Sequence, residues 1–108
     1  MDLVCRTATL HGVPVLQLSG EVDLSTVPSL HRALRRLVDD HRGQVVAVDL
    51  DGIHAIDDAG LGILLGAAGR AREGAGDLVV VSTSERLRGR FATTGLDRAI
   101  HVRDTIVP

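Results

Sequence analysis

The sequence predicts one α/β domain spanning residues 1–108, with a central mixed, mostly parallel β-sheet flanked by three to four helices. Strand-like segments alternate with segments of helical periodicity along most of the chain. The stretches between the later strands are long enough for the helical crossovers that parallel strands require. A chain of 108 residues with 44% hydrophobic residues has the size of one domain and can close a modest core.

The first two predicted strands, residues 3–10 and 13–19, form an antiparallel hairpin. Both are short β-rich runs, and the dipeptide His11-Gly12 between them indicates a turn. The hairpin therefore places one antiparallel strand beside the parallel part of the sheet.

Residues 25–41 form the first predicted helix, and residues 44–50 form the strand that follows it. Pro28 suits the first helical turn and Gly43 suits a helix end. The apolar positions fall on one stripe: Val27, Leu30, Leu34, Leu37 and Val38. The run from Val45 to Val48 is continuously apolar, which is typical of a strand buried on both faces.

The second half of the chain repeats this alternation. A helix is expected over residues 58–73, a strand over 78–81, a third helix capped by Ser82 or Ser84, and a last strand over 99–102. Gly95 ends the third helix. Apolar residues recur at spacings of three and four in the second helix, at Leu61, Leu64, Leu65, Ala68 and Ala71. In the third helix, Leu87 and Phe91 are expected to face inward.

Composition excludes several classes of function. All 12 basic residues are arginine, so the chain lacks the lysine of phosphate-loop NTPases and Schiff-base enzymes. Phe91 is the only aromatic residue, and the formal net charge is −2, so we expect no nucleic-acid binding. A single cysteine, Cys5, permits no internal disulfide, and we interpret it as a buried small hydrophobic residue. No apolar run approaches the length of a membrane span and no signal peptide is apparent, so we expect a cytoplasmic protein.

Acidic residues are the most enzyme-like feature of the chain. Five of them fall near predicted loop ends, where converging carboxylates could hold Mg²⁺: Asp23, Asp49, Asp51, Asp57 and Asp58. Simpler interpretations are available, because Asp51-Gly52 is a typical turn dipeptide and Ser25 and Thr26 precede a helix as capping residues would. We therefore expect no metal site, no cofactor and no catalytic activity.

Two short motifs carry more specific information. Residues 20–23 read Gly-Glu-Val-Asp between a strand and a helix, and residues 56–62 read Ile-Asp-Asp-Ala-Gly-Leu-Gly at the start of the second helix. Together with residues 45–50 and with Thr94-Gly95-Leu96, they resemble the STAS domain of anti-sigma factor antagonists, the SpoIIAA-like family. The resemblance covers nearly the whole chain and implies a STAS-type fold.

The resemblance implies a bacterial regulator that binds a serine-kinase anti-sigma factor of the GHKL type and thereby controls sigma-factor availability. In that family the second motif typically reads Asp-Ser-Ser/Thr-Gly-Leu, and the kinase phosphorylates the first hydroxyl residue. Here that phospho-acceptor position is Asp58, and Ala59 follows it. The chain thus lacks the hydroxyl group on which ordinary phosphorylation control depends.

Physical chemistry gives the second motif a complementary interpretation. The unpaired amides and the dipole of a helix N-terminus stabilise an anion at Asp57 or Asp58. Gly60 and Gly62 either admit a partner's backbone or allow close packing of helix on sheet. Leu61 or Ile63 is expected to be an exposed apolar anchor. The predicted partner-binding residues are Gly20, Glu21, Asp23, Asp57, Asp58, Ala59, Gly60, Leu61 and Ile63.

Two other STAS functions stay open on the sequence. One is a subunit of an ABC-type lipid transporter, and the other is a scaffold that senses a small ligand. On co-purification, recovery of a GHKL-type serine kinase would support sigma-factor control, whereas recovery of a transporter ATPase would overturn it. In each case we expect a monomer or a weak homodimer.

Overall fold

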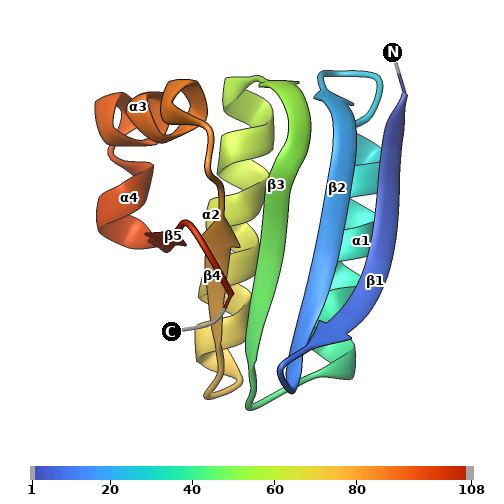
Figure 1. Ribbon diagram of the computed structural model, residues 1–108. Coiled ribbons are helices and arrows are strands. Elements are labelled where there is room, and N and C mark those ends of the chain that lie inside the picture. Colours follow the sequence, from blue (N-terminus) through green and yellow to red (C-terminus); the bar gives the residue numbers. More distant parts are fainter. Residues whose placement is uncertain (1, 107–108) are drawn as a thin grey trace.

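A five-stranded sheet forms the centre of the computed structural model, which describes residues 2–106. Its strands are β1 (Leu3–Leu10), β2 (Val13–Val22), β3 (Val45–Ile56), β4 (Asp77–Val81) and β5 (His101–Arg103). They lie in the order of the sequence (Figure 1). β1 pairs antiparallel with β2, and the other neighbouring pairs are parallel, which confirms the predicted mixed sheet with its N-terminal hairpin.

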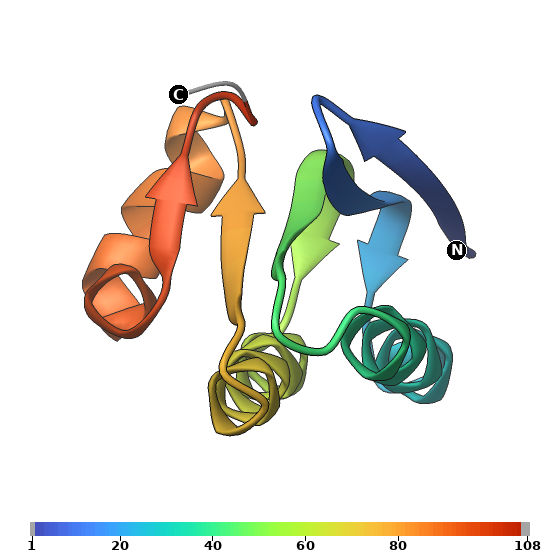
Figure 2. The ribbon, with the colours of Figure 1, turned by 90° about the horizontal axis from the view of Figure 1, so that it is seen from below.

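Four helices accompany the sheet: α1 (Val27–Asp40), α2 (Asp58–Glu73), α3 (Glu85–Thr94) and α4 (Leu96–Ala99). Figure 2 shows α1 and α2 next to each other beneath one face of the sheet, while α3 and α4 lie on the side of β4 and β5. None of the helices in residues 2–106 has the length and apolar character needed to cross a membrane.

One hydrophobic core joins the helices to the sheet. It contains most of the predicted stripe of α1 and buried residues of β2, β3, β4, α2, α3 and α4, with Leu16, Leu64 and Phe91 at most 1% exposed. Val27 of α1 and Leu3 and Cys5 of β1 are partly buried and pack against it. A smaller apolar cluster of Val15, Ala47, Val79 and Val81 lies apart from it, with Ile106 packed against it. The core extends from α1 through α2 to α3, so these elements are held as one body.

β2 and β3 are longer than the sequence suggests. β2 ends at Val22 instead of residue 19, and β3 ends at Ile56 instead of residue 50. Their parallel pairing continues past the predicted ends, from Ser19 opposite Gly52 to Val22 opposite Ile56, with a register shift just before Ser19 and another between Gly20 and Glu21. The interpretation of Asp51-Gly52 as a turn is therefore wrong. A Cβ at Gly52 would lie 2.7 Å from the Cβ of Ser19, so glycine is needed where the two backbones come close.

The C-terminal third differs from prediction in detail. Of the two candidate caps for α3, Ser84 is the one used, and its hydroxyl accepts from the Leu87 amide at 3.2 Å. Ser82 is fully buried and accepts instead from the Ser84 amide. The last strand begins at His101 and not at residue 99, because α4 occupies Leu96–Ala99. Cys5 is half-buried on β1 and not fully buried, and this burial raises the pKa of its thiol.

Candidate functional site

The turns that follow β2 and β3 lie side by side, at the upper edge of Figure 1. Val22 pairs with Ile56, and the Asp57 amide donates to the Val22 carbonyl at 3.1 Å. Gly60 rests on both strand ends, since a Cβ there would lie 2.6 Å from Val22 Cγ1 and 2.8 Å from Ile56 Cγ1. The first turn of α2 thus packs directly on the ends of the two strands. The two sequence motifs are therefore neighbours in the structure.

The turn between β2 and α1 is braced by side chains. Asp23 Oδ1 accepts from the Ser25 amide (2.9 Å), the Ser25 hydroxyl (2.6 Å) and the Thr26 amide (3.2 Å). The bond from the Ser25 hydroxyl, with those from the two amides, lowers the pKa of Asp23. Thr26 Oγ1 donates to the Glu21 carbonyl at 2.9 Å and accepts from the Asp23 amide at 3.0 Å.

This bracing corrects the expectation that Ser25 and Thr26 cap α1. Thr26 occupies the N-cap position, but its side chain makes no capping hydrogen bond to the helix. Its hydroxyl group is already engaged with residues of the turn itself. The carboxylate of Asp23 supplies the acceptor instead, as in an Asx turn.

Leu24, at the centre of the braced turn, was missed by sequence reasoning. Its side chain is 82% exposed, the largest exposure among the large hydrophobic residues of the described chain. An apolar residue between two turn-forming polar residues, Asp23 and Ser25, was the available signal. Because hydrogen bonds already hold the backbone of this turn, binding through Leu24 would cost little backbone conformational entropy, which suits it to anchor a partner.

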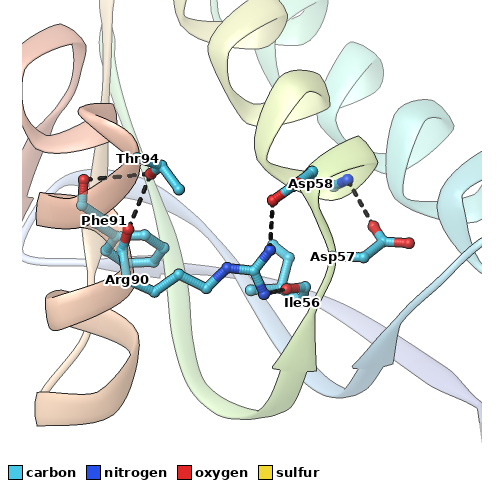
Figure 3. A network of polar contacts seen from close by, with 7 residues as sticks. Ile56, Asp57, Asp58, Arg90, Phe91 and Thr94 are labelled. Carbon is cyan, nitrogen blue, oxygen red and sulfur yellow. Dashed lines mark hydrogen bonds and ion pairs between the residues drawn. The ribbon is translucent and has the colours of Figure 1, made fainter.

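Two consecutive aspartates at the start of α2 have different roles. Asp57 is half-buried and caps the helix, with its Oδ1 accepting from the Gly60 amide at 2.9 Å. The Asp58 side chain is 90% exposed, and its Oδ1 lies 2.6 Å from Nη2 of Arg90 (Figure 3). The sequence predicts that the start of the helix stabilises an anion at Asp57 or Asp58, and Asp57 is the one whose carboxylate accepts a first-turn amide. Asp58 points outward to an arginine of α3.

Arg90 links α3 to the end of β3. Besides its ion pair with Asp58, its guanidinium group donates to the backbone carbonyl of Ile56 (Figure 3). Arg86, one helical turn earlier, donates in the same way to the carbonyl of His54. Sequence reasoning did not identify either arginine, because they lie more than 30 residues from their acceptors. Their spacing of four residues on a predicted helix was the only available signal.

The exposed surface of α2 differs from the one predicted. Leu61 is only 5% exposed and belongs to the core, so it cannot be the expected exposed anchor. Gly60 is also buried, which supports its packing role and not an approach by a partner. Ile63 is half-buried and borders a groove of about 500 Å³ between α1 and α2. The small or apolar residues that α2 does expose are Ala59, Gly62, Leu65, Gly66 and Gly69.

The remaining residues of the first motif have structural tasks. Gly20 adopts a φ of 107°, and a side chain there would collide with the carbonyl of Asp2. Glu21 is half-buried near the end of β2. Gly20 is thus needed for pairing of β1 with β2. The exposed side chain of this turn, Leu24, lies just after the motif.

The five aspartates considered as metal ligands do not converge. Asp49 accepts from the Asp51 amide at 2.9 Å, and Asp51 accepts from the amide and hydroxyl of Thr83 at 2.6 and 3.0 Å. Asp23, Asp57 and Asp58 have the partners described above. Within residues 2–106, no three histidine, cysteine, aspartate or glutamate side chains are grouped so that they could hold a metal ion.

A second groove, of about 790 Å³, lies between β1 and α1. Cys5, Leu16 and Leu37 contribute apolar surface to it, and Arg32 and Arg36 line it as well. No residue of either sequence motif takes part. This groove is therefore separate from the surface formed by the two strand-to-helix turns.

The chain is similar to known proteins of one family. The model of the STAS domain family matches residues 5–107. An anti-sigma-B factor antagonist of Staphylococcus aureus is 28% identical over 104 residues, covering 96% of this chain and 95% of that protein. One from Listeria monocytogenes is 32% identical over 87 residues, covering 81% and 75%.

Solved structures agree with the sequence comparison. The crystal structure of an anti-sigma factor antagonist from Mycobacterium paratuberculosis superposes with a TM-score of 0.85 and 27% identity, covering 96% of this chain and 87% of that one. Family model, relatives and fold are consistent over nearly the full length, and the chain belongs to the STAS domain family.

Proposed function

We propose that this protein is an anti-sigma factor antagonist that binds a GHKL-type serine-kinase anti-sigma factor and so regulates sigma-factor availability. The antagonists of S. aureus and L. monocytogenes, similar along most of their length, support this assignment. The observation that carries it is the exposed start of α2 beside the rigid turn of Asp23 and Leu24. The protein acts by docking, without catalysis, as a monomer or weak homodimer.

Asp58 makes the proposed antagonist insensitive to phosphorylation at this position. A carboxylate has no hydroxyl group to accept a phosphoryl group, and the following residue is Ala59. Asp58 carries about one negative charge, against about −1.5 to −2 for a phosphoserine. Its ion pair with Arg90 balances even that charge. We therefore favour permanent docking over a permanent off state.

Co-purification followed by a kinase assay tests this function. The tagged chain is expected to recover a serine-kinase anti-sigma factor, whereas recovery of a transporter ATPase would overturn the proposal. The kinase is then incubated with labelled ATP and either the natural chain or Asp58→Ser. We expect label on Asp58→Ser alone. Label on residues 56–62 of the natural chain would refute insensitivity. Affinity of the unphosphorylated Asp58→Ser form raised more than about tenfold would show that Asp58 is a built-in off state.

The docking surface is tested by substitutions that leave the core intact. Gly62→Arg adds a side chain at a position with open space, and Leu24→Ala removes the exposed apolar group of the turn. Both should weaken binding about tenfold or more if these residues lie within the interface. Leu10→Ala is the matched control, since Leu10 is also exposed but lies at the β1–β2 hairpin, the opposite end of β2. Equal affinities in all three variants would exclude this surface.

A further inference from the structure

We propose that Arg90 is a charge-compensating residue of the docking surface, which keeps Asp58 paired when a partner covers the start of α2. This inference rests on the proposed function, because it requires that a partner covers Asp58. It assigns a binding role to α3, whose sequence lies outside both motifs of the surface.

The geometry of Arg90 supports two simultaneous contacts. Nη1 donates to the carbonyl of Ile56, the last residue of β3, while Nη2 holds Oδ1 of Asp58 at 2.6 Å (Figure 3). The planar guanidinium group can engage both acceptors in a fixed orientation, which a lysine ammonium cannot do. The Arg90 side chain is 35% exposed against 90% for Asp58, so the arginine is the better anchored member of the pair.

The acidic character of the surrounding surface gives this contact its importance. The two motifs contribute four carboxylates, from Glu21, Asp23, Asp57 and Asp58. Among the ion pairs of residues 2–106, only the one with Arg90 involves any of these four. Arg90 is therefore the basic side chain that balances charge where the partner is expected to dock.

Docking changes the free energy that the Asp58–Arg90 ion pair contributes. In the free chain Asp58 is hydrated, and an exposed pair contributes little to stability. A partner that covers the start of α2 removes that water, and a carboxylate without a counter-charge then carries an uncompensated desolvation cost. With Arg90 in place the carboxylate enters the interface already paired. The structure thus allows aspartate at a position where an unpaired charge would oppose binding.

The test compares two arginines of the same helix. Arg90→Met and Arg86→Met each remove a guanidinium group that donates to a β3 carbonyl, but only Arg90→Met leaves Asp58 without its partner. Affinity is measured for the serine-kinase anti-sigma factor that the natural chain recovers. We expect Arg90→Met to weaken binding about tenfold or more, and several times more than Arg86→Met. The double variant Asp58→Asn with Arg90→Met should bind at least about threefold more tightly than Arg90→Met alone, because no unpaired charge then enters the interface.

Equal losses in Arg86→Met and Arg90→Met would overturn the proposal, since they would show only that α3 must be docked. Failure of Asp58→Asn to recover binding would also overturn it. A second measurement separates this inference from the proposed function. Hydrogen exchange of the Gly60 and Leu61 amides in the free chain should accelerate about twofold or more in Arg90→Met and not in Arg86→Met. Absence of any anti-sigma factor bound to the natural chain would refute the proposed function, and unchanged exchange would refute the anchoring of Asp58 by Arg90.

Discussion

At the scale of single residues, Asp57 and Asp58 show how position on a helix determines the role of a side chain. Asp57 precedes the first helical residue and has extended backbone angles, so its carboxylate can accept from the Gly60 amide three residues later. Asp58 is one residue further along and projects away from the helix toward Arg90. The first carboxylate stabilises the helix, and the second belongs to the surface that we propose binds a partner.

Replacing these aspartates should therefore have unequal effects on stability. Asp57→Ala removes the cap of α2 and is expected to lower the free energy of unfolding by about 1 kcal/mol, within a range of about 0.5–2 kcal/mol. Asp58→Ala should cost clearly less, because an exposed ion pair contributes little. Urea unfolding followed by far-UV circular dichroism measures both. Equal losses would contradict the division of roles.

The lowered pKa of Asp23 predicts that the stability of the fold depends on pH. Its pKa is lower in the folded chain than its ordinary value of 3.8, mainly because the Ser25 hydroxyl donates to it. The unfolded chain consequently binds the proton more readily. The stabilisation is complete above the ordinary pKa and is lost as the pH falls through the lower, folded-state value. Asp39, whose pKa Arg70 lowers, contributes in the same direction.

Asp23→Asn isolates the part due to the turn. Asparagine keeps an acceptor oxygen for the turn but does not titrate, so the free energy of unfolding should decline less steeply with acidification below about pH 4. Urea titrations across that range, with Asp39→Asn as the comparison, measure the slope. A slope equal to that of the natural chain would show that the folded chain does not lower the pKa of Asp23.

At the scale of secondary-structure elements, α2 contains glycines with opposite surroundings. Gly60 is buried against Val22 and Ile56, whereas Gly62 has no heavy atom within 4 Å of a Cβ placed there. Glycine within a helix is unfavourable by about 1 kcal/mol relative to alanine. Close packing on β2 and β3 accounts for Gly60, while no contact within the described chain accounts for Gly62.

Alanine substitutions separate the two glycines. Gly60→Ala should destabilise the chain, because overpacking costs about 1–3 kcal/mol and outweighs the gain in helix propensity. Gly62→Ala should stabilise it by up to about 1 kcal/mol. Thermal and urea unfolding of both variants measure the difference. A stabilised Gly60→Ala would show that α2 can shift away from the strand ends.

At the scale of the whole molecule, arginine side chains attach the later elements to the sheet. Arg86 and Arg90 of α3 donate to carbonyls of β3, and Arg72 of α2 donates to the carbonyl of Ala99 at 2.6 Å. A guanidinium group has five donors in a fixed fork and can serve a carbonyl and a carboxylate together. Arg72 does so as well, since its Nε lies 2.9 Å from Asp77. These contacts give Arg72, Arg86 and Arg90 a structural role in a chain whose basic residues are all arginine.

The main hydrophobic core, which α3 shares with β2 and α2, predicts that α3 unfolds together with the rest of the protein. Phe91 is fully buried in the cluster that also contains Leu16 of β2 and Leu64 of α2. Phe91→Ala should lower the free energy of unfolding by about 3–5 kcal/mol in one cooperative transition. Leu24→Ala, at an 82% exposed position, should change it by less than about 0.5 kcal/mol. A separate early transition confined to α3 in Phe91→Ala would contradict a single cooperative unit.

The sequence by itself determined the fold class, the family resemblance and the absence of a hydroxyl group at position 58. Helical periodicity and buried strand runs are local signals, and the N-terminal hairpin and the apolar stripe of α1 followed from them correctly. The ends of β2 and β3 did not follow, because their last residues are held by pairing with each other across more than 30 residues of chain. Local turn signals such as Asp51-Gly52 were overridden by that pairing.

Only the tertiary structure decided which residues are exposed at the proposed docking surface. Leu61 was expected to be exposed from its place at the start of α2. It packs into the core instead, because the small Gly60 lets the first turn of α2 lie close to the ends of the strands. Leu24 is exposed because hydrogen bonds across its turn leave it pointing away from the core. Arg90 reaches Asp58 because the packing of α3 brings together residues 32 positions apart. The burial of Leu61, the exposure of Leu24 and the pairing of Arg90 with Asp58 depend on the arrangement of whole elements, so the local pattern at these positions does not determine them.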